Sequence, residues 1–380
     1  MLAVTNIHRL KPVSLMRYDR SGGDSEIRVK IPTWEMWTPM NAKKLLVLSA
    51  LLLFGLAMKV NAQEKSPMKL VATTPLPGFT GDFDHFAVDL KGKRLFLTAE
   101  DHKTVEVFDL DGKRIKSITG FGQPHAILFM TDVNKFIVTD GDGFGMVELV
   151  SGEDYKILNT IKLPPEVDGA QFNPVNNYYY VESGGGEKGA KDHKINIIDS
   201  KAFKLVGDIT LPGTHSEAMA ITRDGKKMYV NLSTPKEVGV VDLETRQLTA
   251  RWPITGAETP NSMALDEPHH RLLIATRTPP KMFVFNTDDG KIVTSVPIST
   301  FNDDMWFDVA RKRIYLSGSD TTTVVEQKDA DHYAVISEVP TGYRAKTSLY
   351  VPQLNRFYAA ISGKGKPDAQ LAIKVYDVQP

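Results

Sequence analysis

The chain contains no cysteine among its 380 residues. This absence excludes disulfide bonds, thiolate nucleophiles and cysteine-ligated zinc. The sequence also lacks a Gly-x-Ser-x-Gly elbow and a His-Glu-x-x-His helix motif, so the common sequence signatures of serine hydrolases and zincins are absent. A chain without cysteine is compatible with an oxidising compartment, although the absence does not by itself indicate one.

The chain has no excess charge of either sign, because 46 Lys and Arg residues balance 46 Asp and Glu residues. The balance is uneven along the sequence. Residues 1–62 hold nine basic and four acidic residues, which leaves 37 basic and 42 acidic residues from Gln63 onward. A mildly acidic body of this kind does not favour nucleic acid as a partner.

An apolar run long enough to span a membrane is also missing. The apolar segment at Leu45–Met58 covers 14 residues, against about 18 or more for a spanning helix. Lys43-Lys44 precede it and Val60-Asn61-Ala62 follow it, which is the pattern of a cleaved export signal. We therefore expect a signal peptide at 40–62, a mature chain at 63–380 without a membrane span, and a periplasmic or secreted protein. Residues 1–39 show no periodicity, and we expect them to be a non-native or disordered extension.

A unit of about 40–45 residues with four short strands recurs along the rest of the chain. Its clearest copy is Glu217–Leu243, EAMAITRDGKKMYVNLSTPKEVGVVDL, in which strand-sized apolar runs alternate with turn residues. The apolar residues that close the first strand of each unit are Val88, Phe129, Phe172, Ile221, Leu265, Phe307 and Tyr350. The apolar residues seven positions later are Leu95, Phe136, Tyr179, Met228, Leu272, Ile314 and Phe357. Seven such registers predict an all-β, seven-bladed β-propeller with four-stranded antiparallel blades.

The fourth strands predict how the ring closes. The segments Lys156–Pro165, Lys204–Gly213 and Lys291–Thr300 share one motif, and the chain stops at Pro380 directly after the third strand of its last unit. The same motif occurs near the other end, as KLVATTPLPG at Lys69–Gly78. We expect this N-terminal strand to complete the last blade, because an open ring would leave unpaired strand edges. Residues 63–380 then form one domain.

The units GKKMYV…VGVVDL and KRLFLTAEDHKTVEVFDL resemble the YVTN-repeat, YncE-like propellers, whose units read DGKxxYVxN…xVxVID. The likeness covers about residues 69–380 and implies a seven-bladed ring. It implies no single function, because rings of this size include binding proteins, lactonases, lyases and dehydrogenase subunits. The groove of basic and aromatic residues that single-stranded nucleic acid needs is not visible in the sequence.

The first strand of each blade lines the channel of a propeller, so the residues at the start of these strands should meet at one mouth. The residue four positions before each anchor is polar in all seven units: Asp84, His125, Asp168, Glu217, Asn261, Asp303 and Lys346. His85 and Asp304 lie beside two of them. Loops on the same face supply further candidates: Glu100, His102, Asp140, Asp142, Glu182 and Arg277. We predict that these side chains form a ligand-binding site.

The polar ring has three interpretations. Asp168, Glu217, Asn261 and Asp303 offer oxygen ligands for Ca²⁺, whereas a transition metal would prefer His125 or His85 with carboxylates. Alternatively, crowded carboxylates raise one another's pKa, and one of them could serve as a general acid beside His125. In the third interpretation the ring only hydrogen-bonds water in a wet channel.

These observations favour an exported, monomeric propeller that binds a small molecule or an envelope protein at the channel mouth. The alternative is a metal-assisted hydrolase, lactonase or lyase that uses the same mouth. A third alternative is a protein-interaction scaffold without a small-molecule site, which a large exposed apolar patch would favour.

Overall fold

The computed structural model describes residues 66–185, 189–366 and 368–380. The expected signal peptide at 40–62 and extension at 1–39 lie outside the described residues. Over the described part, no helix is long and apolar enough to cross a membrane. The strands and two short 3₁₀ turns, Glu267–His269 and Pro352–Leu354, make up its regular secondary structure.

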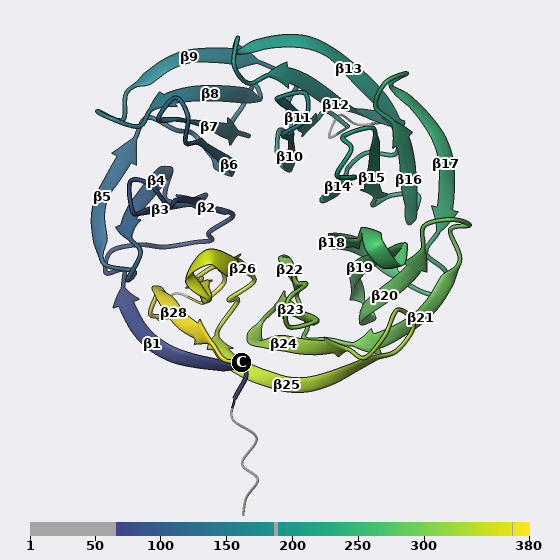
Figure 1. Ribbon diagram of the computed structural model, residues 1–380. Helices are drawn as coiled ribbons and strands as arrows, with labels where there is room; N and C mark the ends of the chain where they lie inside the picture. The colour runs from purple at the N-terminus through teal and green to yellow at the C-terminus, as the bar shows by residue number, and fades with distance from the viewer. Residues whose placement is uncertain (1–65, 186–188, 367) are drawn as a thin grey trace, which may run out of the picture. The chain divides into compact units, whose positions relative to one another are not determined.

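Seven four-stranded antiparallel sheets stand around a central axis as the blades of a β-propeller (Figure 1). The innermost strands are β2 (Phe86–Asp89), β6 (Pro124–Met130), β10 (Ala170–Asn173), β14 (Met219–Ile221), β18 (Glu258–Asp266), β22 (Met305–Asp308) and β26 (Thr347–Val351). The second strands are β3 (Arg94–Ala99), β7 (Lys135–Asp140), β11 (Tyr178–Ser183), β15 (Lys227–Leu232), β19 (Arg271–Thr278), β23 (Arg313–Ser317) and β27 (Arg356–Ile361). The third strands are β4 (Thr104–Asp109), β8 (Met146–Ser151), β12 (Asp192–Asp199), β16 (Glu237–Asp242), β20 (Pro280–Asn286), β24 (Asp320–Gln327) and β28 (Ala372–Val378). The outermost strands are β5 (Arg114–Thr119), β9 (Ile157–Lys162), β13 (Lys204–Pro212), β17 (Gln247–Pro253), β21 (Ile292–Pro297), β25 (Tyr333–Gly342) and β1 (Met68–Pro75). We number the blades 1 to 7 from β2 to β26.

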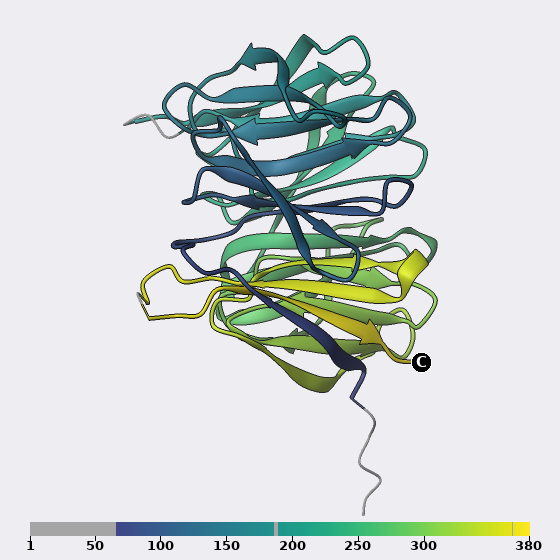
Figure 2. The ribbon, with the colours of Figure 1, turned by 90° about the vertical axis from the view of Figure 1, so that its left-hand side faces the viewer.

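The ring closes as the sequence predicts. β1 pairs antiparallel with β28, so the sheet of blade 7 has the order β1-β28-β27-β26. Figure 2 shows this first strand running along the last blade of the chain. The two ends of the described domain are therefore held together by one sheet, and the ring has no free edge at its seam.

The seven predicted registers are confirmed residue by residue. Each apolar anchor of a first strand lies directly across from the residue seven positions later, for example Val88 from Leu95 and Ile221 from Met228. The same pairing holds in the other five blades. A seven-residue interval is the length of a tight hairpin that keeps both residues on one face of the sheet.

Apolar side chains fill the spaces between the blades. Among the described residues, the buried apolar side chains form seven large clusters, and each cluster joins two neighbouring blades. Phe96 of blade 1 packs on Phe136 of blade 2 with ring centroids 5.1 Å apart, and both are fully buried. The cluster around Phe86 and Tyr358 joins blade 1 to blade 7. Each blade is thus stabilised by both neighbours, as repeat architectures require.

The outermost strand of every blade carries a β-bulge. The residues skipped by the bulges are Val71, Ile115, Leu158, Val206, Thr249, Val293 and Ile336, and a second bulge in β25 skips Thr341. A bulge disrupts the regular hydrogen-bond ladder of an edge and increases its twist, which hinders pairing with another chain.

Candidate functional site

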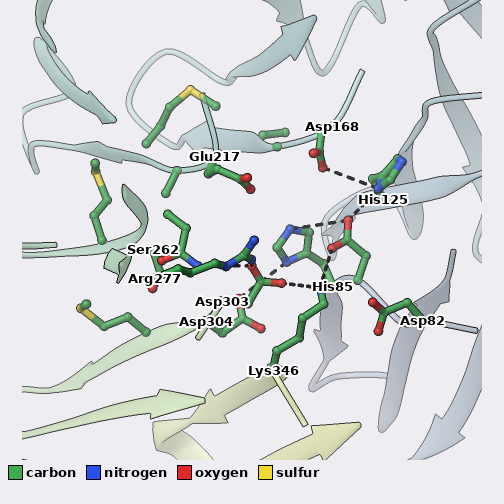
Figure 3. Close-up of a pocket in the computed structure, with 18 of the residues that line it drawn as sticks. Asp82, His85, His125, Asp168, Glu217, Ser262, Arg277, Asp303, Asp304 and Lys346 are labelled. Carbon is green, nitrogen blue, oxygen red and sulfur yellow. Dashed lines mark hydrogen bonds and ion pairs between the residues drawn. The ribbon is translucent and has the colours of Figure 1, made fainter. Parts of the chain in front are cut away.

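The seven polar residues predicted for the channel mouth line one cavity of about 420 Å³. They reach it because each sits at or just before an innermost strand, where the chain arrives from the outermost strand of the preceding blade (Figure 1). His85, Asp304, Glu100 and Arg277 line the same cavity. Figure 3 shows the labelled side chains pointing into a common space from different blades.

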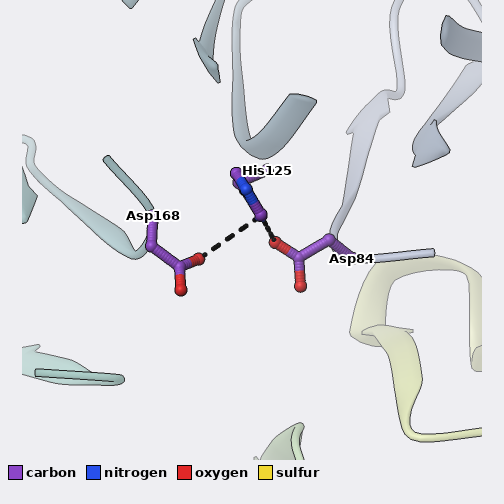
Figure 4. A group of neighbouring side chains, drawn as sticks. All are labelled: Asp84, His125 and Asp168. Atoms are coloured by element: carbon purple, nitrogen blue, oxygen red, sulfur yellow. Dashed lines mark hydrogen bonds and ion pairs between the residues drawn. The ribbon is translucent and has the colours of Figure 1, made fainter. Parts of the chain in front are cut away.

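His125 lies between two carboxylates from neighbouring blades (Figure 4). Its Nδ1 is 2.9 Å from Asp84 Oδ2 and 3.5 Å from Asp168 Oδ1. Burial alone would lower the pKa of His125, but the hydrogen bond to Asp84 and the charges of both carboxylates raise it to about 9. Burial raises the pKa of Asp168 to about 6, and the nearby charges of Asp84 and Glu217 act in the same direction. The protonated imidazole of His125 thus forms ion pairs with both carboxylates.

His215 makes a second arrangement of this kind on the other side of Asp168. Its Nε2 is 3.1 Å from Glu217 Oε1 and 3.9 Å from Asp168 Oδ2, while its Nδ1 is 3.2 Å from Glu182 Oε1. Burial would lower the pKa of His215, but the bonds to Glu182 and Glu217 raise it to about 11. The sequence analysis missed this residue. No repeated residue type marks its position, because His215 lies six positions before its anchor, where other units hold residues as different as Gln123 and Phe301.

Glu182 lies behind the cavity wall and is fully buried. It is the fifth residue of β11, the second strand of blade 3. The fifth residue of the second strand is Thr98 in blade 1 and Thr139 in blade 2. Those threonines accept a hydrogen bond from a backbone N–H of their own blade's first strand or the residue before it. The longer glutamate reaches the next blade instead, where Oε1 accepts from Ser216 N and contacts His215. Burial raises the pKa of Glu182 to about 7.

Asp303 is the centre of a different set of contacts. Its carboxylate accepts a hydrogen bond of 2.5 Å from Arg277 Nη2 and another from the ammonium of Lys346. Lys346 also lies 3.8 Å from Asp84 Oδ1 and is buried. Burial opposes the charged form of each partner, but the opposite charges raise the pKa of Lys346 and lower the pKa of Asp303. These groups remain permanently charged at neutral pH.

Arg344 and Phe301 extend this paired region and were also missed by the sequence analysis. The Arg344 guanidinium is 4.1 Å from the centroid of the Phe301 ring, and that of Arg277 is 4.9 Å from it. Arg344 Nη2 donates to Asp82 Oδ2 at 2.6 Å. Arg344, Phe301, Arg277 and Asp82 all line the cavity. On this part of the cavity wall, two guanidinium groups therefore make cation–π contacts with the same Phe301 ring.

His85 and Asp304 lie where the two regions meet. His85 is 3.9 Å from Asp84 Oδ2 and 3.7 Å from Asp304 Oδ1. Burial opposes protonation of His85, but the surrounding carboxylates, with Asp84 first, raise its pKa. Burial raises the pKa of Asp304 to about 7, although Ser348 N donates a 2.6 Å hydrogen bond to it. Burial would also raise the pKa of Asp84, but His85, His125 and Lys346 together lower it.

Blade 5 contributes polar atoms without partners. Asn261 and Ser262 are 1% and 5% exposed and line the cavity. Asn261 Nδ2 donates to the carbonyl oxygen of Asn302, but among the described residues Asn261 Oδ1 and Ser262 Oγ have no hydrogen-bond partner. Buried polar atoms without partners cost about 1–3 kcal/mol each.

Some predicted loop residues do not reach the cavity. Asp140 is fully buried and accepts backbone hydrogen bonds from Gly122, Gln123 and Asp142, so it shapes the loop before β6. His102 stacks on Phe79 with centroids 3.9 Å apart. The side chain of Asp142 is more than half exposed beside Lys103. Strand register alone does not distinguish these positions from those on the wall.

Two groups of three residues have ligand atoms within 4.8 Å of one another, close enough to hold a metal ion. One is Asp84, His125 and Asp168, and the other is Asp168, His215 and Glu217. Of the predicted calcium set, Asp168 and Glu217 therefore group with histidines, whereas Asp303 is held by Arg277 and Lys346 and Asn261 donates to a backbone carbonyl and weakly to Asp303.

Comparison with solved structures identifies the fold. A chain of the structure titled "Crystal Structure of Mitotic Checkpoint Complex" is similar with a TM-score of 0.68 and 14% identity, over 93% of this chain and 100% of that one. A chain of Kuenenia stuttgartiensis hydrazine synthase has a TM-score of 0.64 and 17% identity, over 75% of this chain and 96% of that one. No family model and no curated protein matches the sequence. At these identities the likeness establishes the seven-bladed β-propeller fold alone.

Proposed function

We propose that this chain is a binding protein that holds a small polar molecule in the cavity at the channel mouth. The observation that carries the proposal is the convergence of polar side chains from all seven blades on one cavity. A small molecule with several hydrogen-bonding groups could be held by these converging donors and acceptors, as in most small-molecule sites.

The size and lining of the cavity support a small ligand. Its volume of about 420 Å³ falls within the range of about 300–1,000 Å³ typical of ligand sites. Met219, Met263, Met305 and Trp306 add apolar surface to the charged wall. We infer a ligand with several hydrogen-bonding groups and an apolar face that the methionines contact.

A protein partner is the alternative that the fold itself supports, since the first structural neighbour named above is a chain of a protein complex. The exposed large apolar residues give little support to it. Those at the bulges, such as Ile115, Leu158 and Val293, lie on different blades and so do not gather on one face. Single exposed apolar residues of this kind are ordinary and do not mark an interface.

A metal-assisted hydrolase or lyase is the second candidate function. It is favoured by the group of Asp168, His215 and Glu217, because two of these residues line the cavity and all three carry metal-ligand atoms. A metal ion there could polarise a carbonyl or activate a water beside a bound substrate.

Filling the cavity tests the binding proposal. Ala218→Phe and Ser262→Phe each place a ring in the cavity, whereas Val309→Phe adds the same ring at a residue that is 56% exposed. Thermal unfolding of the full chain is measured with a panel of sugars, amino acids, hydroxy acids and lactones. We expect at least one compound to raise the melting temperature of the wild type and of Val309→Phe but not of the two filled variants. Equal shifts in all four proteins, or none in the wild type, would overturn the proposal.

We also propose that the protein is an exported, monomeric member of the YVTN-repeat propellers. The repeated units and the pattern at 40–62 support this assignment. Determining the N-terminal residue of the protein recovered from an expressing bacterium tests the export. A mature chain beginning at Gln63 is expected, and a cytoplasmic chain that retains residues 40–62 would contradict it.

A further inference from the structure

The carboxylates of Asp168 and Glu217 differ from the other acidic groups of the cavity in the partners they have. In the part of the chain that the structure describes, the ion pairs of these two carboxylates are with histidines alone. Both residues line the cavity, and their side chains are 33% and 27% exposed. They are therefore accessible negative groups whose partners can release a proton and become metal ligands, which Lys and Arg cannot do.

The spacing of the three ligand atoms fits the coordination sphere of a metal ion. His215 Nε2 is 3.1 Å from Glu217 Oε1 and 3.9 Å from Asp168 Oδ2. Two ligands about 2.1 Å from one ion lie about 3.0–3.4 Å apart in octahedral or tetrahedral geometry. The ligand atoms of all three residues lie within 4.8 Å of one another, so the Asp168 carboxylate must move inward for one ion to reach all three. We propose that Asp168, His215 and Glu217 bind a divalent transition-metal ion on the wall of the cavity.

A fourth residue, outside the three proposed ligands, supports the site. Glu182 contacts the opposite ring nitrogen, His215 Nδ1, at 3.2 Å and is fully buried. A carboxylate on the far nitrogen of a ligating histidine is the common arrangement in metal centres, because it fixes the ring and raises its basicity. Glu182 Oε1 also accepts from Ser216 N. One buried carboxylate thus holds both the ligand and its loop.

The same loop is fixed from a second side. His193 is buried, with Nε2 at 2.5 Å from Ser216 Oγ and Nδ1 at 3.0 Å from the carbonyl oxygen of Gly213. The segment between β13 and β14 that carries His215 and Glu217 is therefore held in place by both Glu182 and His193. A site held this way needs little rearrangement to accept an ion.

The other group, Asp84, His125 and Asp168, is less suited to a metal ion. Asp84 already has three cationic neighbours, with Lys346 Nζ at 3.8 Å, His85 Nε2 at 3.9 Å and His125 Nδ1 at 2.9 Å. A divalent ion there would be close to Lys346, which cannot move away because it also bonds to Asp303. In the described residues, no Lys or Arg ion pair involves Asp168, Glu217 or Glu182. Like-charge repulsion thus favours the His215 group.

The donor set selects the class of ion. One imidazole nitrogen with two carboxylate oxygens suits Zn²⁺, Mn²⁺, Fe²⁺ or Co²⁺ better than Ca²⁺, which takes six to eight oxygen ligands. The inference rests on the proposed function in one respect: the ion would face the same cavity as the small molecule and leave its open positions toward that molecule.

Elemental analysis and calorimetric titration of the full chain with Zn²⁺ test the site. After treatment with a chelator and dialysis against Zn²⁺, we expect about one ion per wild-type chain. His215→Ala should retain none, and Glu182→Gln should weaken binding about 10–100-fold. His125→Ala should still bind the ion, which separates the two groups. His332→Ala is the matched control, because the side chain of His332 is 77% exposed in a loop.

Three outcomes would overturn the site: no Zn²⁺ or Mn²⁺ bound by the wild type, loss of the ion in His125→Ala but not in His215→Ala, or equal loss in His332→Ala. Thermal unfolding without metal shows whether His215→Ala folds, and Glu182→Gln gives a second test if it does not. The ligand panel is repeated with a chelator present. If the ion analysis overturns the metal site but a panel compound still raises the melting temperature without metal, the binding proposal stands although the metal proposal has failed.

Discussion

The two sides of the cavity neutralise buried charge in different ways. On the side of blades 5 to 7, Asp303 is paired with Arg277 and Lys346, and Arg344 is paired with Asp82 of blade 1. We call this the arginine–lysine side. Around blades 2 to 4, the ion pairs that the carboxylates of Asp168, Glu217 and Glu182 form within the described residues are with His125 and His215. We call this the histidine side.

The difference decides what each side can bind. Arginine and lysine keep their charge at all accessible pH values, so their pairs satisfy each other and give the wall a fixed shape. Histidine holds a proton that can be released, and a neutral imidazole can ligate a metal ion. The arginine–lysine side is therefore expected to determine stability, and the histidine side to determine metal binding.

Removing the charge of Lys346 should have the largest effect on stability. Lys346→Met leaves the carboxylates of Asp303 and Asp84 with one cation fewer in a buried site. Breaking a buried pair typically costs about 3–5 kcal/mol, and chemical denaturation measures this loss. The double variant Lys346→Met with Asp303→Asn should recover part of it. If the double variant is less stable than the sum of the single changes predicts, the pairing does not account for the loss.

Zinc should stabilise the folded chain through the histidine side. At a free Zn²⁺ concentration about 100 times the dissociation constant, binding to the native state adds about 2.7 kcal/mol to the free energy of unfolding. Glu217→Gln should show little of this gain. Without metal the same variant should lose about 1–3 kcal/mol, because the change removes the charge of one of the two carboxylates that bond to the protonated His215. A gain that is the same in both proteins would place the ion elsewhere.

The sequence predicts the ring and the position of its mouth because both follow from strand register. Once Val88 is set opposite Leu95, the pleat determines which residues face the channel, and counting four positions back reaches Asp84 and Lys346 alike. The prediction of one cavity lined by the seven residues agrees with the structure. The closure of the ring by β1 is predictable for the same reason. The motif shared by outermost strands occurs once before the first blade, at the strand that pairs with β28.

The pairing of charges inside the mouth could not be predicted in this way. Loops set the direction of each side chain. His215 and Glu217 lie in the loop between β13 and β14, and the contacts of Glu182 with His215 and of His193 with Ser216 hold that loop in place. Six positions before the anchors, the residue types range from Gln123 to Phe301. A position without a common character gives no pattern to recognise. Register thus predicts which residues meet, whereas the loops determine which of them form pairs.

Asp304 allows the comparison to be tested by pH, because its ion-pair partner is His85 rather than Arg or Lys. Burial raises its pKa from 3.8 to about 7, so folding favours the protonated carboxyl. The stability contributed by that proton is complete below about pH 4 and is lost as the pH rises through 7.

Asp304→Asn should therefore stabilise the chain by about 2 kcal/mol at pH 8 and by less at pH 5, since one pKa unit corresponds to about 1.4 kcal/mol and the Ser348 hydrogen bond persists. Urea denaturation at the two pH values measures the difference. A gain that does not depend on pH would show that the carboxyl does not titrate in this range.

Arg344 tests whether the arginine–lysine side depends on charge alone or also on the planar guanidinium. Arg344→Lys keeps the charge beside Asp82 but loses the stacking on Phe301, whose ring centroid is 4.1 Å from the guanidinium. This substitution should lower the free energy of unfolding by about 0.5–1 kcal/mol, the usual contribution of a partly exposed cation–π contact. Phe301→Leu removes the same contact from the other partner, so a double-mutant cycle isolates it. Strictly additive losses would mean that the ring only fills space, and that charge pairing is sufficient to hold this side of the cavity.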